Sequence, residues 1–205
     1  MKKSIFAVVL IGLASLAACA KIRYPNYYVL NIPSAPSAVP DPPPISGTAA
    51  VREFRAPQYL RQGPIAYRPD PEQVAFYDYD HWAEDPRGAA TTAVLRELQM
   101  RGIFQSAALF DGRASADFLI TGSLDHLEEV DRGNFVSVEV GLSAKLEDLK
   151  TGEIVWSGSS SKTSTVEQRS VSGVVAEMSR NLNDAANQLV ISMQKQAASR
   201  ISASR

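Results

Sequence analysis

Residues 136–146 read Val-Ser-Val-Glu-Val-Gly-Leu-Ser-Ala-Lys-Leu, which is the clearest structural signal in the chain. Apolar residues occupy every second position, and small, polar or charged residues occupy the positions between them. Because successive side chains of a strand point to opposite faces, this alternation predicts a strand with one buried and one solvent-facing side. Such one-sided burial is typical of an antiparallel sheet.

The segments on either side extend this strand into a three-stranded meander. Residues 117–127 predict a strand before it. After it, Asp148-Leu149-Lys150-Thr151-Gly152-Glu153 can form a turn that leads back into Ile154-Val155-Trp156. Residues 157–165 carry Ser or Thr at seven of nine positions. They suit either a polar continuation at the edge of the sheet or a flexible loop.

Two helices are predicted around the meander. Asp85 suits an N-cap and Pro86 the first helical position, and Gly102 can end that helix. A second helix begins at Val171, because apolar side chains recur every three or four residues as far as Met193. Shorter strands are expected upstream, at residues 27–30, 48–54, 64–67 and 74–79.

The first nineteen residues indicate the cellular compartment. Lys2 and Lys3 precede an apolar stretch, residues 5–16, that is shorter than the roughly 20 residues a bilayer span needs. Leu16-Ala17-Ala18-Cys19 resembles the lipobox of bacterial lipoproteins, in which the cysteine thiol accepts diacylglycerol. Cys19 is the only cysteine, and we predict it to be the lipid anchor. The alternative is a soluble secreted protein whose cysteine is incidental.

This interpretation divides the chain into four parts. Residues 1–18 are a cleaved signal peptide, and residues 19–26 a lipidated N-terminus and tether. Residues 27–195 form one domain that contains a Pro-rich spacer at 33–44, and residues 196–205 are a frayed tail. Ala20 follows the cysteine where an inner-membrane retention signal would have Asp. We therefore expect a protein anchored in the outer membrane and facing the periplasm.

Composition excludes several classes of function. Apolar residues make up 45% and charged residues 21% of the chain, which is typical of a globular domain. The formal net charge of −1 gives no sign of a nucleic-acid partner. One Cys and two His are too few for a zinc site or a disulfide framework. No glycine-rich phosphate loop occurs, so we expect neither an ATPase nor a cofactor.

One cluster invites a catalytic or metal-binding hypothesis. It combines His81 with four carboxylates, namely Asp78, Asp80, Glu84 and Asp85, which could bind a divalent ion or act as an acid and base. The same residues suit a strand that leads into a capped helix. We adopt the structural interpretation, and predict no catalytic and no metal-binding residue.

A second cluster combines guanidinium groups with tyrosine rings, types that are enriched at binding hot spots. The candidate partner-binding residues are Arg52, Arg55, Tyr59, Leu60, Tyr67 and Arg68. They would meet a partner protein or lipid headgroups. The alternative is that Arg stems cover the sheet and Tyr rings fill its margin.

The order and spacing of five segments resemble those of a known family. Tyr27-Tyr28-Val29-Leu30 follows the lipobox, and the later segments are Phe54-Arg55-Ala56-Pro57-Gln58-Tyr59-Leu60, Ile65-Ala66-Tyr67-Arg68, Tyr77-Asp78-Tyr79-Asp80-His81-Trp82-Ala83-Glu84-Asp85-Pro86 and Asp117-Phe118-Leu119-Ile120. This pattern is similar to the ABC-type transport auxiliary lipoprotein family, which includes the lipoprotein of paraquat-inducible intermembrane transport systems. The resemblance covers roughly residues 27–195.

The resemblance implies an accessory outer-membrane lipoprotein, not an enzyme. Its partner would be an MCE-type (mammalian-cell-entry domain) substrate-binding protein that works with a permease and an ATPase to move phospholipid or another hydrophobic molecule. The implied fold is α+β, mainly an antiparallel sheet with two long helices packed on it, similar to the TolB amino-terminal domain. Two questions stay open: whether the protein forms a homo-oligomer, and whether it is instead a structural or assembly lipoprotein without a transport role.

Overall fold

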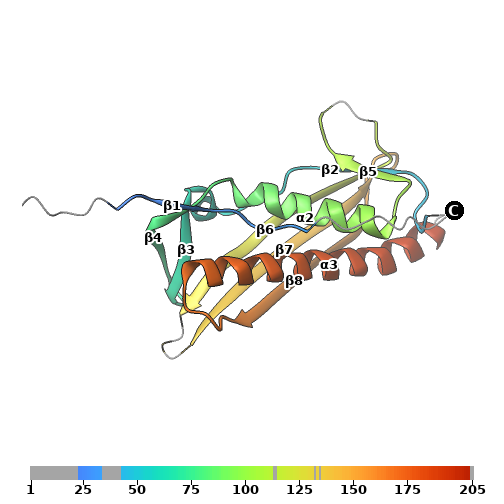
Figure 1. The fold of residues 1–205 in the computed structure, drawn as a ribbon. Coiled ribbons are helices and arrows are strands. Elements are labelled where there is room, and N and C mark those ends of the chain that lie inside the picture. The colour runs from blue at the N-terminus through green and yellow to red at the C-terminus, as the bar shows by residue number, and fades with distance from the viewer. Residues whose placement is uncertain (1–22, 34–42, 113–114, 132, 134, 204–205) are drawn as a thin grey trace, which may run out of the picture.

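The computed structural model describes residues 23–33, 43–112, 115–131, 133 and 135–203. Within them, two long α-helices pack on a mixed, mostly antiparallel sheet, so the predicted α+β class is confirmed (Figure 1). In chain order the elements are β1 (Asn26–Tyr28), β2 (Thr48–Val51), the 3-10 helix η2 (Gln58–Arg61), β3 (Pro64–Asp70), β4 (Gln73–Trp82), α2 (Pro86–Arg101), β5 (Ser106–Leu109), β6 (Phe118–Asp131), β7 (Val136–Asp148), β8 (Glu153–Thr165) and α3 (Val171–Ala203).

The predicted meander is present as β6, β7 and β8, which pair antiparallel in that order. On β7 the even-numbered apolar side chains are buried, with Val138 and Leu142 fully excluded from solvent. The polar stretch after Trp156 continues β8, because its residues pair with β7 from Ser157 opposite Lys145 to Thr165 opposite Ser137. The strand alternative for residues 157–165 is therefore the correct one.

In the described part of the chain, β6 pairs with three strands of the sheet. One edge pairs with β7, and the other edge pairs with two different strands. Parallel strand β2 pairs with its beginning, at Phe118 to Ile120, and parallel strand β3 pairs with its end, at Glu129 and Val130. Between these two partners, the chain touches β6 through a single bridge from Arg55 to Ser123. β4 extends the sheet beyond β3, β1 pairs parallel with β4, and β5 pairs parallel with β2.

Both predicted helices are present. The Asp85 carboxylate accepts a hydrogen bond from the Arg87 N–H at 3.0 Å, Pro86 opens α2, and Gly102 closes it with φ of 55°. α3 begins at Val171 as predicted and continues to Ala203. Regular structure thus extends past residue 195, the predicted end of the domain, because Ala197 is fully buried against the core.

The N-terminal segment belongs to the folded domain. The side chains of Tyr28, Leu30 and Ile32 pack against the core, and the Asn31 N–H donates to the Ser179 hydroxyl of α3 at 3.0 Å. The predicted signal peptide, the anchor Cys19 and most of the Pro-rich spacer at 33–44 lie outside the described residues. No helix of the described part is long and apolar enough to cross a membrane.

The upstream strands differ in their bounds from the prediction. β2 ends at Val51 and not at residue 54, because the Phe54 N–H bonds to the Thr91 hydroxyl of α2 at 2.9 Å and leaves the sheet. β3 and β4 run longer than expected, because Tyr67 and Ala75 pair across a hairpin that turns at Pro71 and Glu72.

Candidate functional site

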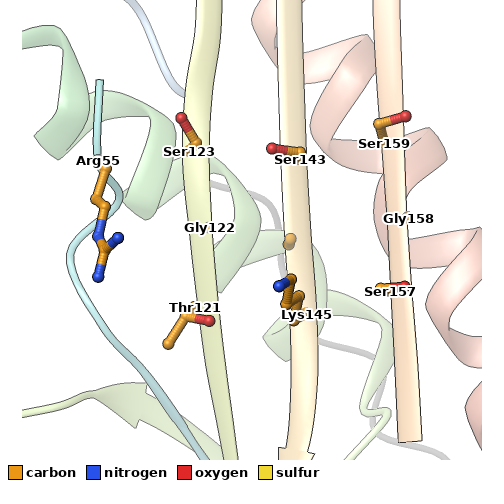
Figure 2. Close-up of a pocket in the computed structure, with 10 residues that line it drawn as sticks. Arg55, Thr121, Gly122, Ser123, Ser143, Lys145, Ser157, Gly158 and Ser159 are labelled. Carbon is orange, nitrogen blue, oxygen red and sulfur yellow. The ribbon is translucent and has the colours of Figure 1, made fainter. Parts of the chain in front are cut away.

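A shallow groove of about 550 Å³ crosses the meander on the face turned away from the helices (Figure 2). Outward-pointing side chains of β6, β7 and β8 line it in two cross-strand rows. One row runs Thr121, Lys145, Ser157, and the other runs Ser123, Ser143, Ser159. Five of these six side chains end in a hydroxyl.

Between the two rows lies a third row of residues without bulk, Gly122, Ala144 and Gly158. A Cβ atom at Gly122 would collide with the Phe54 ring, which packs directly beneath the strand. Glycine is therefore required there so that the core ring can approach the backbone.

The charged residues that line the groove, Arg55 and Lys145, are both cationic. The backbone of Arg55 is held by two hydrogen bonds, from its own N–H to the Gly122 carbonyl at 2.9 Å and from the Leu124 N–H to its carbonyl at 2.8 Å. No His, Cys, Asp or Glu is among the lining residues. The groove therefore offers hydrogen-bonding hydroxyls and positive charge.

Two of the predicted partner-binding residues, Tyr59 and Arg68, converge on Glu128 of β6 instead. Arg68 donates to the two Glu128 carboxylate oxygens at 2.6 and 3.0 Å, and the Tyr59 hydroxyl donates to the same carboxylate. Burial raises the pKa of Glu128, but the hydrogen bonds from Arg68 and Tyr59 outweigh it and the net pKa lies below the usual value. This network joins η2 and β3 to β6.

The other predicted residues do not form one surface. Leu60 is 1% exposed, so its prediction as a partner contact was wrong: the side chain completes the core beneath η2. The Tyr67 ring lies 5.1 Å from the Tyr77 ring, and the Arg52 guanidinium lies 5.0 Å from the centre of the Phe110 ring. Of the six residues, Arg55 alone lines the groove.

The acidic cluster around His81 has structural roles in the described residues. Asp80 accepts hydrogen bonds from Asn26 and Tyr28 of β1, each at 3.0 Å, and Asp85 caps α2. The His81 ring lies 5.9 Å from the Tyr27 ring. No group of three or more His, Cys, Asp or Glu side chains in the described part of the chain could hold a metal ion.

The hydroxyls of the groove were not identified as a site from the sequence. Their signal was present, because Ser and Thr fill the outward positions of two strands that pair with each other. The pattern alone does not tell which positions of β6 lie beside them. That depends on the register across a β-bulge between Leu124 and His126.

A family model described as the ABC-type transport auxiliary lipoprotein component matches residues 28–190. The chain belongs to this family. The match spans the elements from the end of β1 to most of α3, and it includes every residue that lines the groove. A search of curated proteins finds no match.

Solved structures share the fold. Protein XCC0632 from Xanthomonas campestris superposes with a TM-score of 0.72 at 18% identity, covering 88% of this chain and 100% of that one. An uncharacterized protein has a TM-score of 0.65 at 11% identity, with 83% and 99% covered. The hypothetical protein CT253 from Chlamydia trachomatis has a TM-score of 0.51 at 8% identity, with 76% and 99% covered. At these low sequence identities, the structural similarity establishes the fold of the auxiliary lipoprotein and not its partners.

Proposed function

We propose that this auxiliary lipoprotein is a non-enzymatic component of an ABC transport system that docks an MCE-type periplasmic substrate-binding protein at the outer membrane. The transported molecule would be a phospholipid or another hydrophobic molecule. The observation that carries the proposal is the family match over residues 28–190. The lipobox-like sequence that ends in Cys19 supports membrane anchoring.

The docked N-terminal strand supports a short tether. Because β1 begins at Asn26, six residues at most separate the acylated Cys19 from the sheet, which is about 20 Å of extended chain. The domain would then stay next to its membrane. Two or more acyl chains on Cys19 would make that attachment stable, since a single chain binds only marginally.

The open face of the meander is the surface that we assign to the protein partner. Its groove presents Arg55 and Lys145 with five hydroxyls, whereas α2 and α3 cover the opposite face of the sheet. Cationic groups in a groove that has no carboxylate among its lining residues favour a partner with acidic side chains at the contact. Arg52 and Tyr67 lie outside this surface and are not assigned to it.

Affinity purification of the full-length protein from detergent-solubilised envelopes tests the function. We expect an MCE-type protein to be recovered, and mass spectrometry to detect an acylated Cys19 peptide. The Cys19→Ala variant should leave the membrane fraction. Absence of an MCE-type protein from the intact, membrane-extracted lipoprotein would contradict the proposal. Recovery of assembly factors alone would favour the structural or assembly role.

Charge reversal tests the assigned surface. Arg55→Glu and Lys145→Glu are expected to reduce recovery of the partner several-fold, because each puts a carboxylate into a cationic groove. Lys195→Glu is the matched control, since Lys195 is an exposed lysine of α3 on the other side of the sheet. Equal recovery with all three variants would remove the groove from the interface.

A further inference from the structure

Exposed aromatic and apolar side chains gather where the chain enters the domain. Tyr24 is 78% exposed, Tyr27 64%, Val29 60% and Tyr79 42%. With Arg23 they form what we call the entry patch, which comprises Arg23, Tyr24, Tyr27, Val29 and Tyr79. Large apolar groups at such exposure carry an unfavourable hydration free energy unless a partner covers them.

The strand pairing brings these residues together. β1 pairs parallel with β4 so that Tyr27 lies opposite His81, with the two rings 5.9 Å apart. Tyr79 is two residues before His81 on β4, and its side chain is exposed. The Arg23 guanidinium lies 5.7 Å from the centre of the Tyr79 ring, which joins the beginning of the chain to β4.

The N-terminal segment itself is amphipathic. Tyr28, Leu30 and Ile32 pack against the core, while the alternate side chains of Tyr27 and Val29 point away from it. The inward side chains account for the docking of the segment on the domain. The outward apolar side chains make no contribution to the core. They would have a lower free energy in an environment less polar than water.

The position of the entry patch identifies that environment. β1, β3 and β4 lie at one end of the molecule, and the C-terminal end of α3 lies towards the other (Figure 1). Arg23 is four residues after Cys19, so the two are separated by at most about 14 Å of extended chain. If Cys19 is acylated as proposed above, the entry patch cannot move far from the headgroups of the bilayer that holds the lipid.

We propose that the entry patch is a second membrane contact, which lies in the interfacial layer of the bilayer and orients the domain upon it. This proposal rests on the lipid anchor of the proposed function. Tyrosine suits the layer because its ring is apolar and its hydroxyl stays hydrated at headgroup level. Arg23 adds attraction to anionic lipid. The anchor keeps the local concentration of the patch high, so a weak contact is sufficient.

Fluorescence quenching by brominated lipid tests the contact. The full-length chain, processed in cells and purified, is reconstituted into vesicles of phosphatidylethanolamine and phosphatidylglycerol whose acyl chains carry bromine near the headgroup. Tyr27→Trp and Tyr79→Trp report from the entry patch. The native Trp82 and Trp156 are buried and give a constant background, measured with the wild type.

Ile154→Trp is the matched control, because Ile154 is 52% exposed and lies at the far end of the sheet. It pairs with Glu147, which in turn pairs with Leu119 beside β2. We expect the entry-patch variants to be quenched about twofold more than the control, since bromine reaches only residues in the bilayer. Near-ultraviolet circular dichroism verifies that each variant is folded, and either entry-patch variant is sufficient for the test.

The outcomes separate this contact from the anchor. If the protein is acylated at Cys19 and floats with the vesicles, but the entry-patch variants are quenched no more than Ile154→Trp, the patch faces water or another protein and the proposal is overturned. The anchor then stands. If Cys19 carries no lipid and the protein does not float, both the anchor and the membrane contact are overturned.

Discussion

Glu128 and Glu129 are neighbours on β6, but their side chains leave the strand on opposite faces and meet different partners. Glu128 accepts from Arg68 and Tyr59, while Glu129 accepts a hydrogen bond from the Tyr77 hydroxyl at 2.6 Å. Burial raises the pKa of Glu129, and the single tyrosine bond does not offset it. The net pKa of Glu128 is lowered instead. The pKa values of two adjacent carboxylates thus shift in opposite directions.

These shifts predict opposite dependences of stability on pH. Glu128 stabilises the fold above its unfolded pKa of about 4.5, and that contribution is lost as pH falls through the lowered folded pKa. The contribution of Glu129 is fully present below about pH 4.5 and is lost as pH rises through its raised folded pKa. Glu129→Gln should therefore gain stability over the wild type as pH rises from 4.5 to 7.

Urea unfolding of the wild type and both Gln variants between pH 4 and pH 7 measures this. Glu128→Gln is expected to lose more stability at pH 7 than at pH 4, because the variant cannot form the ion pair with Arg68. The Glu129→Gln variant is expected to follow the reverse trend. Parallel pH curves for the two variants would be inconsistent with the two environments described for β6.

Gly122 and Gly88 provide a second pair of contrasting positions. Gly122→Ala is expected to destabilise the protein by about 1–3 kcal/mol, because the new Cβ would collide with the buried Phe54 ring. Gly88→Ala should stabilise it by about 0.5–1 kcal/mol, since Gly88 lies within α2 and a Cβ there meets no atom within 4 Å. The midpoint of thermal unfolding measures both. An unchanged or raised midpoint for Gly122→Ala would contradict the packing beneath β6, and a lowered midpoint for Gly88→Ala would contradict the open space beside α2.

At the scale of the element, α2 depends on its cap. Asp85→Ala should cost about 0.5–2 kcal/mol, because the Arg87 N–H at the start of the helix loses its acceptor. Asp85→Asn keeps a side-chain oxygen and is expected to lose only part of this stability. Urea unfolding followed by far-ultraviolet circular dichroism distinguishes the two. An Asn variant as unstable as the Ala variant would assign the effect to charge and not to capping.

The elements that could be predicted are those whose signal is local. The alternation of residues 136–146 and the Asp85-Pro86 start of α2 each rest on nearby residues, and both are confirmed. β5 was not predicted, because Ser106, Ala107 and Ala108 carry little strand propensity and form a strand by pairing with β2. β2 and β3 were predicted as strands, but their parallel pairing with β6 was not, since that pairing depends on the tertiary fold.

For the candidate sites too, the contacts between residues distant in the sequence could not be predicted. Tyr59 and Arg68 have the composition of a binding surface, yet they satisfy a buried carboxylate 69 and 60 residues away in the sequence. No spacing rule links them to Glu128. The groove likewise forms from three strands. The register in which these strands pair could not be predicted from the sequence. Arg55 was one of the candidate partner-binding residues and it lines the groove, but its neighbours there could be found only from the structure.

For the molecule as a whole, the N-terminal segment is predicted to be part of the folding unit. A chain that begins at residue 43 lacks β1 and the inward side chains of Tyr28, Leu30 and Ile32. We expect it to be less stable than a chain that begins at residue 23, by on the order of 3 kcal/mol or more, because that apolar surface is no longer buried. Urea unfolding of the two chains measures the difference.

A peptide of residues 23–33 is the control for that comparison. Added in excess to the shorter chain, it should raise the midpoint of unfolding, because it can bind where β1 docks. The same peptide with Tyr28 and Leu30 replaced by Ser should not. If the two chains unfold at the same urea concentration, the packing of the segment contributes nothing to stability.

If the chain is secreted and acylated at Cys19 as proposed above, the docking of β1 also orders events in time. Residues 26–32 leave the membrane first, but their partners come much later: Asp80 on β4, the Arg96 side chain of α2 that bonds to the Ile32 carbonyl, and Ser179 on α3. Residues 26–32 therefore cannot form these contacts until nearly all of the rest of the chain has emerged from the membrane. An enzyme that acylates Cys19 would meet it during this interval. The last step of folding would then draw the domain against the membrane to which Cys19 is already attached.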